Sequence, residues 1–317
     1  MQLYLGVVPG IFPWLKEWAI HKEMVKRKAG IVFSYWSFRK YIKQIVAKGI
    51  HGFFSYDGPI MIDSGAYSSF NTGINIHVKD YCAFLSKIDI QNGDIVINLD
   101  EVGNSLKSKE NWTYLTEKFD FPILPVIHFP EIKEFYSDEL YLGLGGMVPA
   151  FKINQAGSIY DVLFWIIDRN LKSKKKFHGF GVGSPYHQIL FQDLLYSADW
   201  IGWRRNAAVC SCYTPEGSRY INEARKKIKK EKALSLELFE QYTPPFIHTY
   251  EMLYRPGTEG WNYRALWNVW WFLLAGDYKK QMESSKYIIS IKKRIHQRML
   301  KAEISNLQSS VFTKDPS

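Results

Sequence analysis

The stretch MIDSGAYSSF, from Met61 to Phe70, brings an apolar run to an abrupt end at Asp63 and continues with a Ser-Gly turn. Three further apolar runs end in similar polar or glycine-rich turns: DEVGN (100–104), LGG (144–146) and GVGSP (181–185). Amphipathic stretches separate these runs along the chain. Short apolar runs that alternate with amphipathic stretches are typical of repeated βα units.

This alternation predicts seven strands and five helices. The strands are expected at 30–35, 60–63, 94–99, 123–126, 140–143, 176–181 and 199–203. The helices are expected at 38–48, 78–88, 111–118, 159–170 and 186–196. A doubly wound open sheet has the same local pattern. We favour an α/β fold of the (β/α)8 TIM-barrel type, in which the C-terminal strand ends form the functional face.

The character of the sequence changes after Cys212. A basic helical run is expected at 218–239, followed by a Pro-Pro turn, a Trp-rich helix at 261–274 and a basic helix at 278–300. We therefore assign most of the barrel to 1–212, a helical, Trp-rich extension that packs on or completes it to 213–304, and a disordered tail to 305–317.

Composition narrows the class of protein. Among 317 residues, 41 Lys and Arg against 31 Asp and Glu give a formal net charge of +10. Such an excess favours a polyanionic partner, although a solvated basic surface without a partner has the same composition. Three cysteines are too few for a disulfide framework, and no apolar run approaches the roughly 18 residues of a membrane span. A cytoplasmic protein without membrane association is expected.

Three aspartates stand at or near strand ends: Asp63 in MIDSGAY, Asp100 in VINLDEVGN and Asp199 in SADWIGWRR. Each has an ordinary structural role open to it. Asp63 and Asp199 would suit helix capping, and Asp100 would suit binding of loop amides. An ionised carboxylate only accepts hydrogen bonds, so Asp100 would also suit the N–H edge of a guanine-like base.

Two glycine turns add to this set. LGLGGMVPA (142–150) would let backbone approach a ligand closely, and it lacks the Lys-Ser/Thr of a phosphate loop. FHGFGVGSP (177–185) carries Phe180 into a second turn, where the ring would also suit the core.

In order and spacing these motifs resemble the tRNA-guanine transglycosylases, and most of all the phage and bacterial DNA-guanine transglycosylases that insert 7-deazaguanines. The family's DSGG(F/Y)Q turn is matched by DSGAYS, with Ala66 and Ser68 departing from it. The family also has a strand that ends in an Asp-Glu pair, matched at 100–101. Its GG(L)(A) site is matched at 145–148, and its Met-Gly-Val-Gly strand end is matched at 180–183. The resemblance covers roughly residues 55–205.

The resemblance implies a role for each matched residue. Asp63 would be the general acid and base, and Asp199 the nucleophile that attacks the sugar C1′. Asp100 would read the N1/N2 edge of the base. The remaining substrate-binding positions are Ser64, the rings Tyr67 and Phe180 on either side of the base, His128 where the family often has Gln, and the backbone at Gly145, Gly146 and Met147. This chemistry requires no cofactor.

Two departures from the family need a choice. The archaeal FDSAS pattern places the nucleophile at Asp199, whereas the bacterial VDMFD pattern would place it at Gly202. We favour Asp199, because the other register leaves no nucleophile. The zinc motif CxCxxC keeps only Cys210 and Cys212, with His248 further on. Since three ligands leave a closed zinc site incomplete, we expect packing to hold this loop, with zinc as the alternative.

The expected function is replacement of guanine in DNA by a free 7-deazaguanine, such as 7-cyano-7-deazaguanine, through a covalent Asp–sugar intermediate. The alternatives are exchange on tRNA, a non-catalytic nucleic-acid-binding homologue and an unrelated (β/α) hydrolase. Basic side chains expected at phosphates are Arg204, Arg205, Lys226, Lys227, Lys229 and Lys230. A homodimer stays open. The compartment would be a bacterial host's cytoplasm if the protein is phage-encoded.

Overall fold

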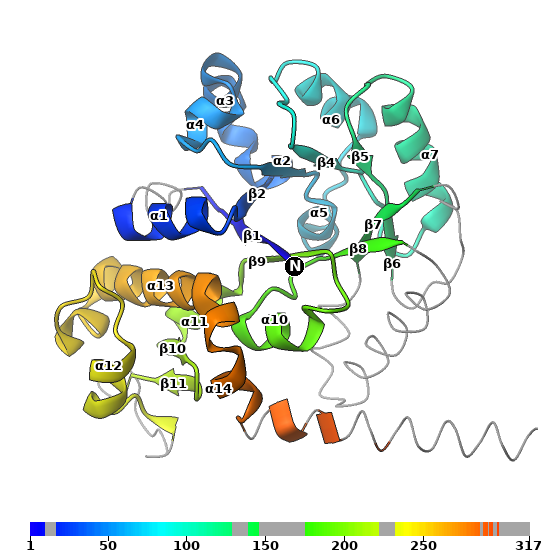
Figure 1. Cartoon of the computed structure of the whole chain (residues 1–317). Helices are drawn as coiled ribbons and strands as arrows, with labels where there is room; N and C mark the ends of the chain where they lie inside the picture. Colours follow the sequence, from blue (N-terminus) through cyan, green and yellow to red (C-terminus); the bar gives the residue numbers. More distant parts are fainter. Residues whose placement is uncertain are drawn as a thin grey trace, which may run out of the picture.

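Nine parallel strands form the main sheet of the computed structural model, in the order β5-β4-β3-β2-β1-β9-β8-β7-β6 (Figure 1). The structure describes residues 1–9, 17–128, 139–145, 175–221, 232–285, 288–290, 292–293 and 297. The strands are β1 Gln2–Gly6, β2 Gly30–Ser34, β3 Ile60–Asp63, β4 Ile95–Ile97, β5 Ile123–Leu124, β6 Val126–His128, β7 Tyr141–Gly145, β8 Lys176–Gly179 and β9 Ser197–Trp200.

The two outermost strands of this order are one strand in the chain. Only Pro125 separates β5 from β6, and proline has no N–H with which to continue a ladder. β5 pairs with β4, β6 pairs with β7, and the Pro125 carbonyl accepts the Gly143 N–H at 2.8 Å. With β5 and β6 counted as one strand, the sheet closes on itself as an eight-stranded barrel. The predicted (β/α)8 barrel is confirmed.

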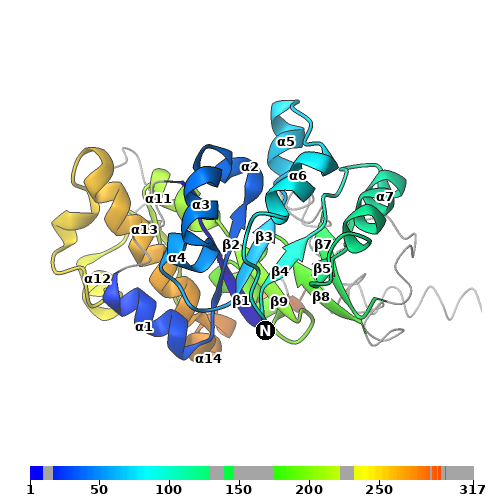
Figure 2. The ribbon, with the colours of Figure 1, turned by 90° about the horizontal axis from the view of Figure 1, so that it is seen from above.

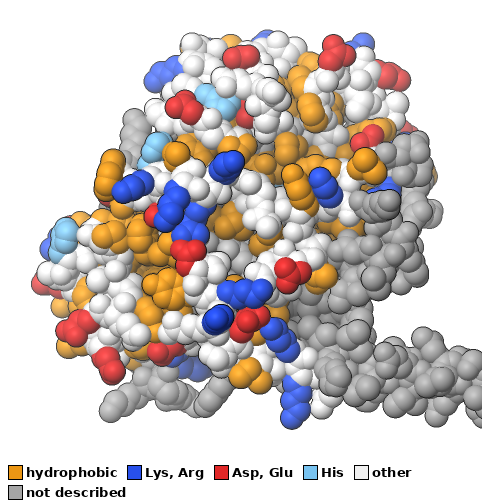
Figure 3. Space-filling view, viewed as in Figure 1, with side chains coloured by type: hydrophobic (Ala, Val, Ile, Leu, Met, Phe, Trp, Pro, Cys, Tyr) orange, Lys and Arg blue, Asp and Glu red, His pale blue; other side chains and the backbone are white. Residues whose placement is uncertain are grey.

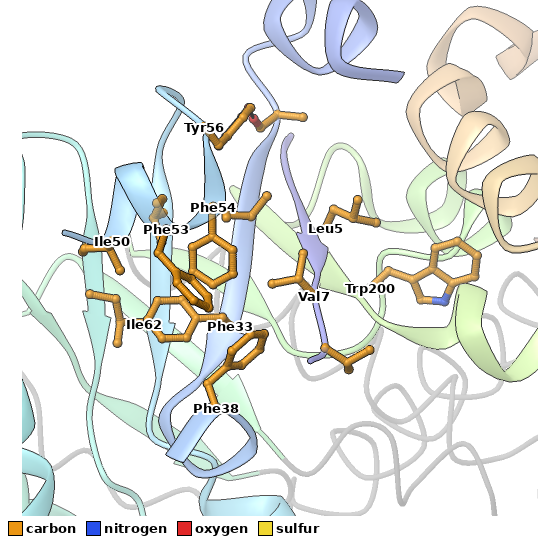
Figure 4. Close-up of a cluster of buried hydrophobic side chains, with 14 of the residues drawn as sticks. Leu5, Val7, Phe33, Phe38, Ile50, Phe53, Phe54, Tyr56, Ile62 and Trp200 are labelled. Carbon is orange, nitrogen blue, oxygen red and sulfur yellow. Dashed lines mark hydrogen bonds between the residues drawn. The ribbon is translucent and has the colours of Figure 1, made fainter. Parts of the chain in front are cut away.

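Helices surround the barrel on its outer side (Figure 2). They are α1 Trp18–Lys26, α2 Tyr35–Phe38, α3 Ile42–Lys48, α4 Ile50–Phe54, α5 Ala66–Thr72, α6 Val78–Leu85, α7 Ser105–Thr116, α10 Pro185–Phe191 and α11 Gly202–Ala208. The largest core cluster fills the layer between strands and helices, where Phe33, Phe38 and Phe54 pack in edge and tilted contacts (Figure 4).

The inside of the barrel has its own smaller cluster. Alternate residues along the strands point inward. The apolar members are Tyr4, Val32, Met61, Ile97, Leu124 and Val126, with Tyr141 and Phe180 packed against them. This packed interior leaves the chemistry to the strand ends.

The C-terminal part packs beside the barrel (Figure 1). It contains a hairpin, β10 Ser211–Thr214 and β11 Gly217–Tyr220, then α12 Leu236–Tyr242, α13 Gly257–Leu274 and α14 Lys279–Glu283. Asn268 of α13 accepts the Tyr213 N–H at 2.9 Å and donates to the Ser211 carbonyl at 2.9 Å. The Trp-rich helix thus satisfies the backbone of β10 directly, and its prediction is confirmed.

The structure differs from the predicted elements at several places. The strand predicted at 199–203 is wrong at its end, because β9 ends at Trp200 and α11 begins at Gly202, and helices α1, α4, α5 and α11 were not predicted. The first strand, β1, was not predicted, although it sits between β2 and β9 and is needed for closure. The predicted helix at 218–239 is wrong at its start, where β11 forms a hairpin, and wrong at Leu234, which precedes α12. The predicted helix at 278–300 is interrupted at Ser284 and Ser285.

Two predicted segments lie outside the described residues, the helix at 159–170 and the tail at 305–317. Within the part of the chain that is described, no helix combines the length and apolar character needed to cross a membrane.

Candidate active site

Three carboxylates meet at the C-terminal end of the barrel. Asp63 is the last residue of β3, Asp100 follows β4, and Asp199 lies in β9, level with Tyr4 of β1. The negative charges of Asp100 and Asp199 both raise the pKa of Asp63, after the larger effect of burial. Asp100 and Asp199 are therefore both close enough to Asp63 to act on its charge.

Asp63 has the most perturbed environment of the three. Burial raises its pKa to about 7, the Gly65 N–H opposes that shift, and the two neighbouring carboxylates add to it. Most of the side chain is enclosed by protein, with some solvent contact at the strand end. A carboxyl with a pKa near 7 can both give and take a proton at neutral pH.

The turn after Asp63 is shaped by Gly65. Its φ of 87° is left-handed, and a Cβ there would collide with Ser34 Oγ and Trp36 Cβ. Gly65 is itself the N-cap of α5, without a side-chain cap, so the capping role considered for Asp63 is not observed. Ser64 is fully buried, and its Oγ accepts the Ala66 N–H at 3.3 Å within the turn.

The loop that carries Asp100 is held by helix α7. Ser108 Oγ accepts the Glu101 N–H at 2.8 Å, and Asn111 Nδ2 donates to the Leu99 carbonyl at 2.9 Å. The Tyr81 hydroxyl lies 3.1 Å from the carbonyls of both Ile62 and Ile97, next to the ends of β3 and β4. These bonds fix the positions of Asp63 and Asp100 relative to each other.

His128 ends β6 and contacts Asp100 directly. Its Nε2 lies 2.7 Å from Asp100 Oδ2, so the imidazole occupies one carboxylate oxygen. Space for the ring comes from Gly145 on β7, where a Cβ would lie 2.5 Å from His128 Cδ2. The glycine that the sequence analysis assigned to backbone binding therefore also makes room for His128.

Asp199 is held through one of its two oxygens. The Gly181 N–H donates to Oδ1 at 2.8 Å, and His178 Nε2 lies 3.3 Å from the same atom. Below it, Ser197 Oγ is 2.6 Å from His178 Nδ1 and 2.5 Å from the Tyr141 hydroxyl. The sequence analysis missed His178, Ser197 and Tyr141. Their signal is the spacing of two along a strand, which puts Ser197 on the inward side with Asp199.

The two rings predicted to enclose a base differ in their settings. Phe180 follows β8, is half-buried and packs against the barrel interior, and Gly143 makes room for it, since a Cβ there would lie 2.7 Å from Phe180 Cε2. Tyr67 lies on α5 and is 41% exposed. Phe180 is therefore packed against the barrel interior, whereas Tyr67 is largely open to solvent.

The other predicted site residues are either exposed at the surface or lie outside the residues that the structure describes. Arg204 and Arg205 are exposed on α11, just beyond the end of β9. Gly146, Met147, Lys226, Lys227, Lys229 and Lys230 lie outside the described residues.

The cysteine region is packed around a buried cation. Cys212 is fully buried, and burial raises the pKa of its thiol, which disfavours the thiolate that zinc binds. Arg264 lies near this thiol and donates to the carbonyls of Ala207 and Leu253. His248 is exposed. In the described parts of the chain, no three His, Cys, Asp or Glu side chains are grouped closely enough to hold a metal ion.

Fold and site together define a (β/α)8 barrel with three aspartates at or near the C-terminal ends of its strands. No known protein-family model matches the chain. It is similar to the tRNA-guanine(15) transglycosylase of Picrophilus torridus, with 29% identity over 202 residues, 56% of this chain and 31% of the relative. The enzyme of the same name from Nanoarchaeum equitans is 28% identical over 219 residues, 61% of this chain and 52% of the relative.

The chain thus spans about a third to a half of the length of these archaeal relatives. At these identities, the chain resembles part of each of these two proteins.

Proposed function

We propose that this protein exchanges guanine in DNA for a free 7-deazaguanine, 7-cyano-7-deazaguanine or a relative, through a covalent Asp199–sugar intermediate. The observation that carries the proposal is the grouping of Asp63, Asp100 and Asp199, with the pKa of Asp63 raised to about 7. One carboxyl is thereby suited to proton transfer beside carboxylates that can bind a base and attack a sugar.

In the first half of the reaction, Asp199 Oδ2 attacks C1′ and the C1′–N9 bond to guanine breaks. The electron pair of that bond goes to the departing base, which takes a proton from protonated Asp63 and leaves as neutral guanine. Positive charge builds on the sugar as the bond breaks, and ionised Asp199 stabilises that charge before capturing it. The order parallels a retaining glycosidase.

The second half reverses these steps with a new base. N9 of the deazaguanine attacks C1′, its proton passes to ionised Asp63, and the C1′–Oδ2 bond breaks to restore the Asp199 carboxylate. No water is consumed and no oxidant or metal is needed. The general acid is regenerated in each cycle, so a pKa near neutrality serves both halves.

Base recognition falls to the side chains around Asp63. One oxygen of Asp100, Oδ1, accepts hydrogen bonds from the N1–H and N2–H edge of the base. The other oxygen, Oδ2, lies 2.7 Å from His128 Nε2. Phe180 supplies a flat surface for stacking, and Tyr67 covers the base from the rim. A guanine inside a duplex is inaccessible to these groups, so the target nucleotide is flipped out or unpaired.

Exchange on tRNA is the second candidate, and the names of the archaeal relatives favour it. The incomplete cysteine motif, in which Cys210 and Cys212 lack the third cysteine of CxCxxC, favours DNA because it departs from the tRNA enzymes. Both candidates use the same chemistry at the same three carboxylates.

Label exchange distinguishes these activities. The protein is incubated with radiolabelled guanine, or with 7-cyano-7-deazaguanine, and with duplex DNA, single-stranded DNA or tRNA. Label retained in DNA supports the proposal, and label retained only in tRNA replaces it with the second candidate. Abasic sites without incorporation would indicate a hydrolase, and no turnover with any substrate would indicate a binding protein. Asp63→Ala and Asp199→Ala serve as inactive controls.

A further inference from the structure

A line of buried polar groups runs through the barrel interior and ends at Asp199. It contains Tyr141 of β7, Ser197 of β9 and His178 of β8, all on inward-facing positions. The hydroxyls of Tyr141 and Ser197 are 2.5 Å apart, and Ser197 Oγ is 2.6 Å from His178 Nδ1. A fully buried histidine bonded to hydroxyls at the centre of a barrel is costly unless its polar atoms are used.

Each hydroxyl of this line can donate one hydrogen bond and accept others. In one arrangement the Tyr141 phenol donates to Ser197 Oγ. The Ser197 hydroxyl then donates to His178 Nδ1. With Nδ1 accepting, the ring proton is on Nε2, the nitrogen that lies 3.3 Å from Asp199 Oδ1.

The contact from His178 to Asp199 is long, and its alignment falls short of a good hydrogen bond. Among the described residues, Nε2 has no other acceptor. Hydrogen bonds that assist catalysis are often long before the substrate binds. Edge contacts with Tyr4 and Phe180, at 5.9 and 4.7 Å between ring centroids, hold the imidazole in this orientation.

We propose that His178 is a positioning residue for the nucleophile, set in the Nε2–H tautomer by Ser197 and Tyr141 and donating to Asp199 Oδ1. Together with the Gly181 N–H it ties down Oδ1. The hydrogen bonds of the Asp199 side chain to described residues all use Oδ1, so Oδ2 is left to attack C1′. This inference rests on the proposed function, because it assigns Asp199 as the nucleophile.

The kinetic test compares His178→Phe with His178→Gln. Phe keeps the ring's size but removes the donor, and we expect the rate of glycosyl-enzyme formation in a single turnover to fall about 10- to 100-fold. The KM for the deazaguanine should change less than about threefold, since Asp199 does not read the base. Gln can donate from its amide, so it should recover part of the rate.

The control is Val32→Ala, a buried residue of the barrel interior outside this line. Equal rate losses in His178→Phe and Val32→Ala, or no recovery with Gln, would show that His178 only fills space and would overturn the inference. Ser197→Ala should lower the rate in the same direction as His178→Phe, with KM unchanged. An unchanged rate in Ser197→Ala would equally overturn it.

A second measurement does not depend on turnover. Nitrogen-15 resonances of the His178 ring in the intact protein report which nitrogen carries the proton. We expect protonated Nε2 and unprotonated Nδ1, with the Nε2 resonance shifted in Asp199→Ala. The opposite tautomer would overturn the inference. If the wild type exchanged no base, the proposed function would fail, while this spectrum would still decide the contact between His178 and Asp199.

Discussion

At the scale of single residues, the buried carboxyl of Asp63 couples the site to stability. Its pKa is about 7 in the folded chain and near 3.8 when unfolded. Between these values the folded state binds more protons than the unfolded state, so the free energy of unfolding falls as pH rises from about 4 to above 7. The shifted acid therefore makes the fold less stable at the pH where it works.

Asp63→Asn removes this dependence, because the amide has no charge to bury. We expect the variant to match the wild type near pH 4 and to exceed it by about 2–4 kcal/mol at pH 8. Denaturant unfolding at both pH values measures the difference, and other titrating groups cancel between the two proteins. A variant that is equally or less stable at pH 8 would contradict the raised pKa.

The contact between His128 and Asp100 depends on the absence of a side chain at Gly145. Gly145→Ala places a methyl group where His128 lies, so the ring must move away from Asp100. We expect weaker binding of the free deazaguanine, by about 10-fold, measured by titration calorimetry. Gly276→Ala meets no atom within 4 Å and is the matched control. Equal affinities in the two variants would separate His128 from base binding.

The three aspartates were predictable because each stands in a motif beside a strand end. His178, Ser197 and Tyr141 were not, because the spacing of two shows only that Ser197 shares a side of its strand with Asp199, and not which residues of other strands it meets. Only the register of β7, β8 and β9 shows that these side chains face one another. Gly145 was predicted to bind a ligand through its backbone. That it also makes room for His128 can be seen only from the pairing of β6 with β7.

At the scale of elements, helix α13 stabilises the hairpin by side-chain hydrogen bonds. Asn268 is fully buried and bonds the Tyr213 N–H and the Ser211 carbonyl, and Trp267 Nε1 donates to the Tyr213 carbonyl at 2.6 Å. The hairpin was not predicted, since its strands are short and Arg219 and Lys-rich neighbours suggested a basic helix. β1 was missed because a five-residue run at the start of the chain has no preceding helix to mark it.

Replacement of Asn268 by Leu removes both of its hydrogen bonds to the backbone of β10. We expect a loss of about 2–4 kcal/mol in the free energy of unfolding. Asn262→Leu, on the same helix but partly exposed, controls for the substitution itself. Thermal or denaturant unfolding of both variants measures the difference. Similar losses in the two would mean that β10 is held by packing alone.

At the scale of the whole molecule, the net charge of +10 supports nucleic-acid binding only if the basic side chains lie where a nucleic acid would bind. Among the described residues on the face shown in Figure 3, basic and acidic side chains are interspersed and form no continuous basic patch. Three aspartates lie at one end of the barrel, and their negative charge would repel a phosphate. Phosphates near these aspartates therefore need cations beside them, and Arg204 and Arg205 are exposed at the start of α11, directly after β9.

Each arginine that contacts a phosphate releases about one counterion from duplex DNA, so the logarithm of affinity falls linearly with the logarithm of salt concentration. Arg204→Ser with Arg205→Ser should weaken DNA binding and reduce that slope by about 1–2. Lys26→Ser is the matched control, because α1 ends at Lys26 just before β2 begins, at the opposite end of the barrel. Fluorescence anisotropy over a salt series measures both slopes. If the double variant kept the wild-type slope, the phosphates would lie away from α11, and the nucleic acid would have to approach the three carboxylates from another side.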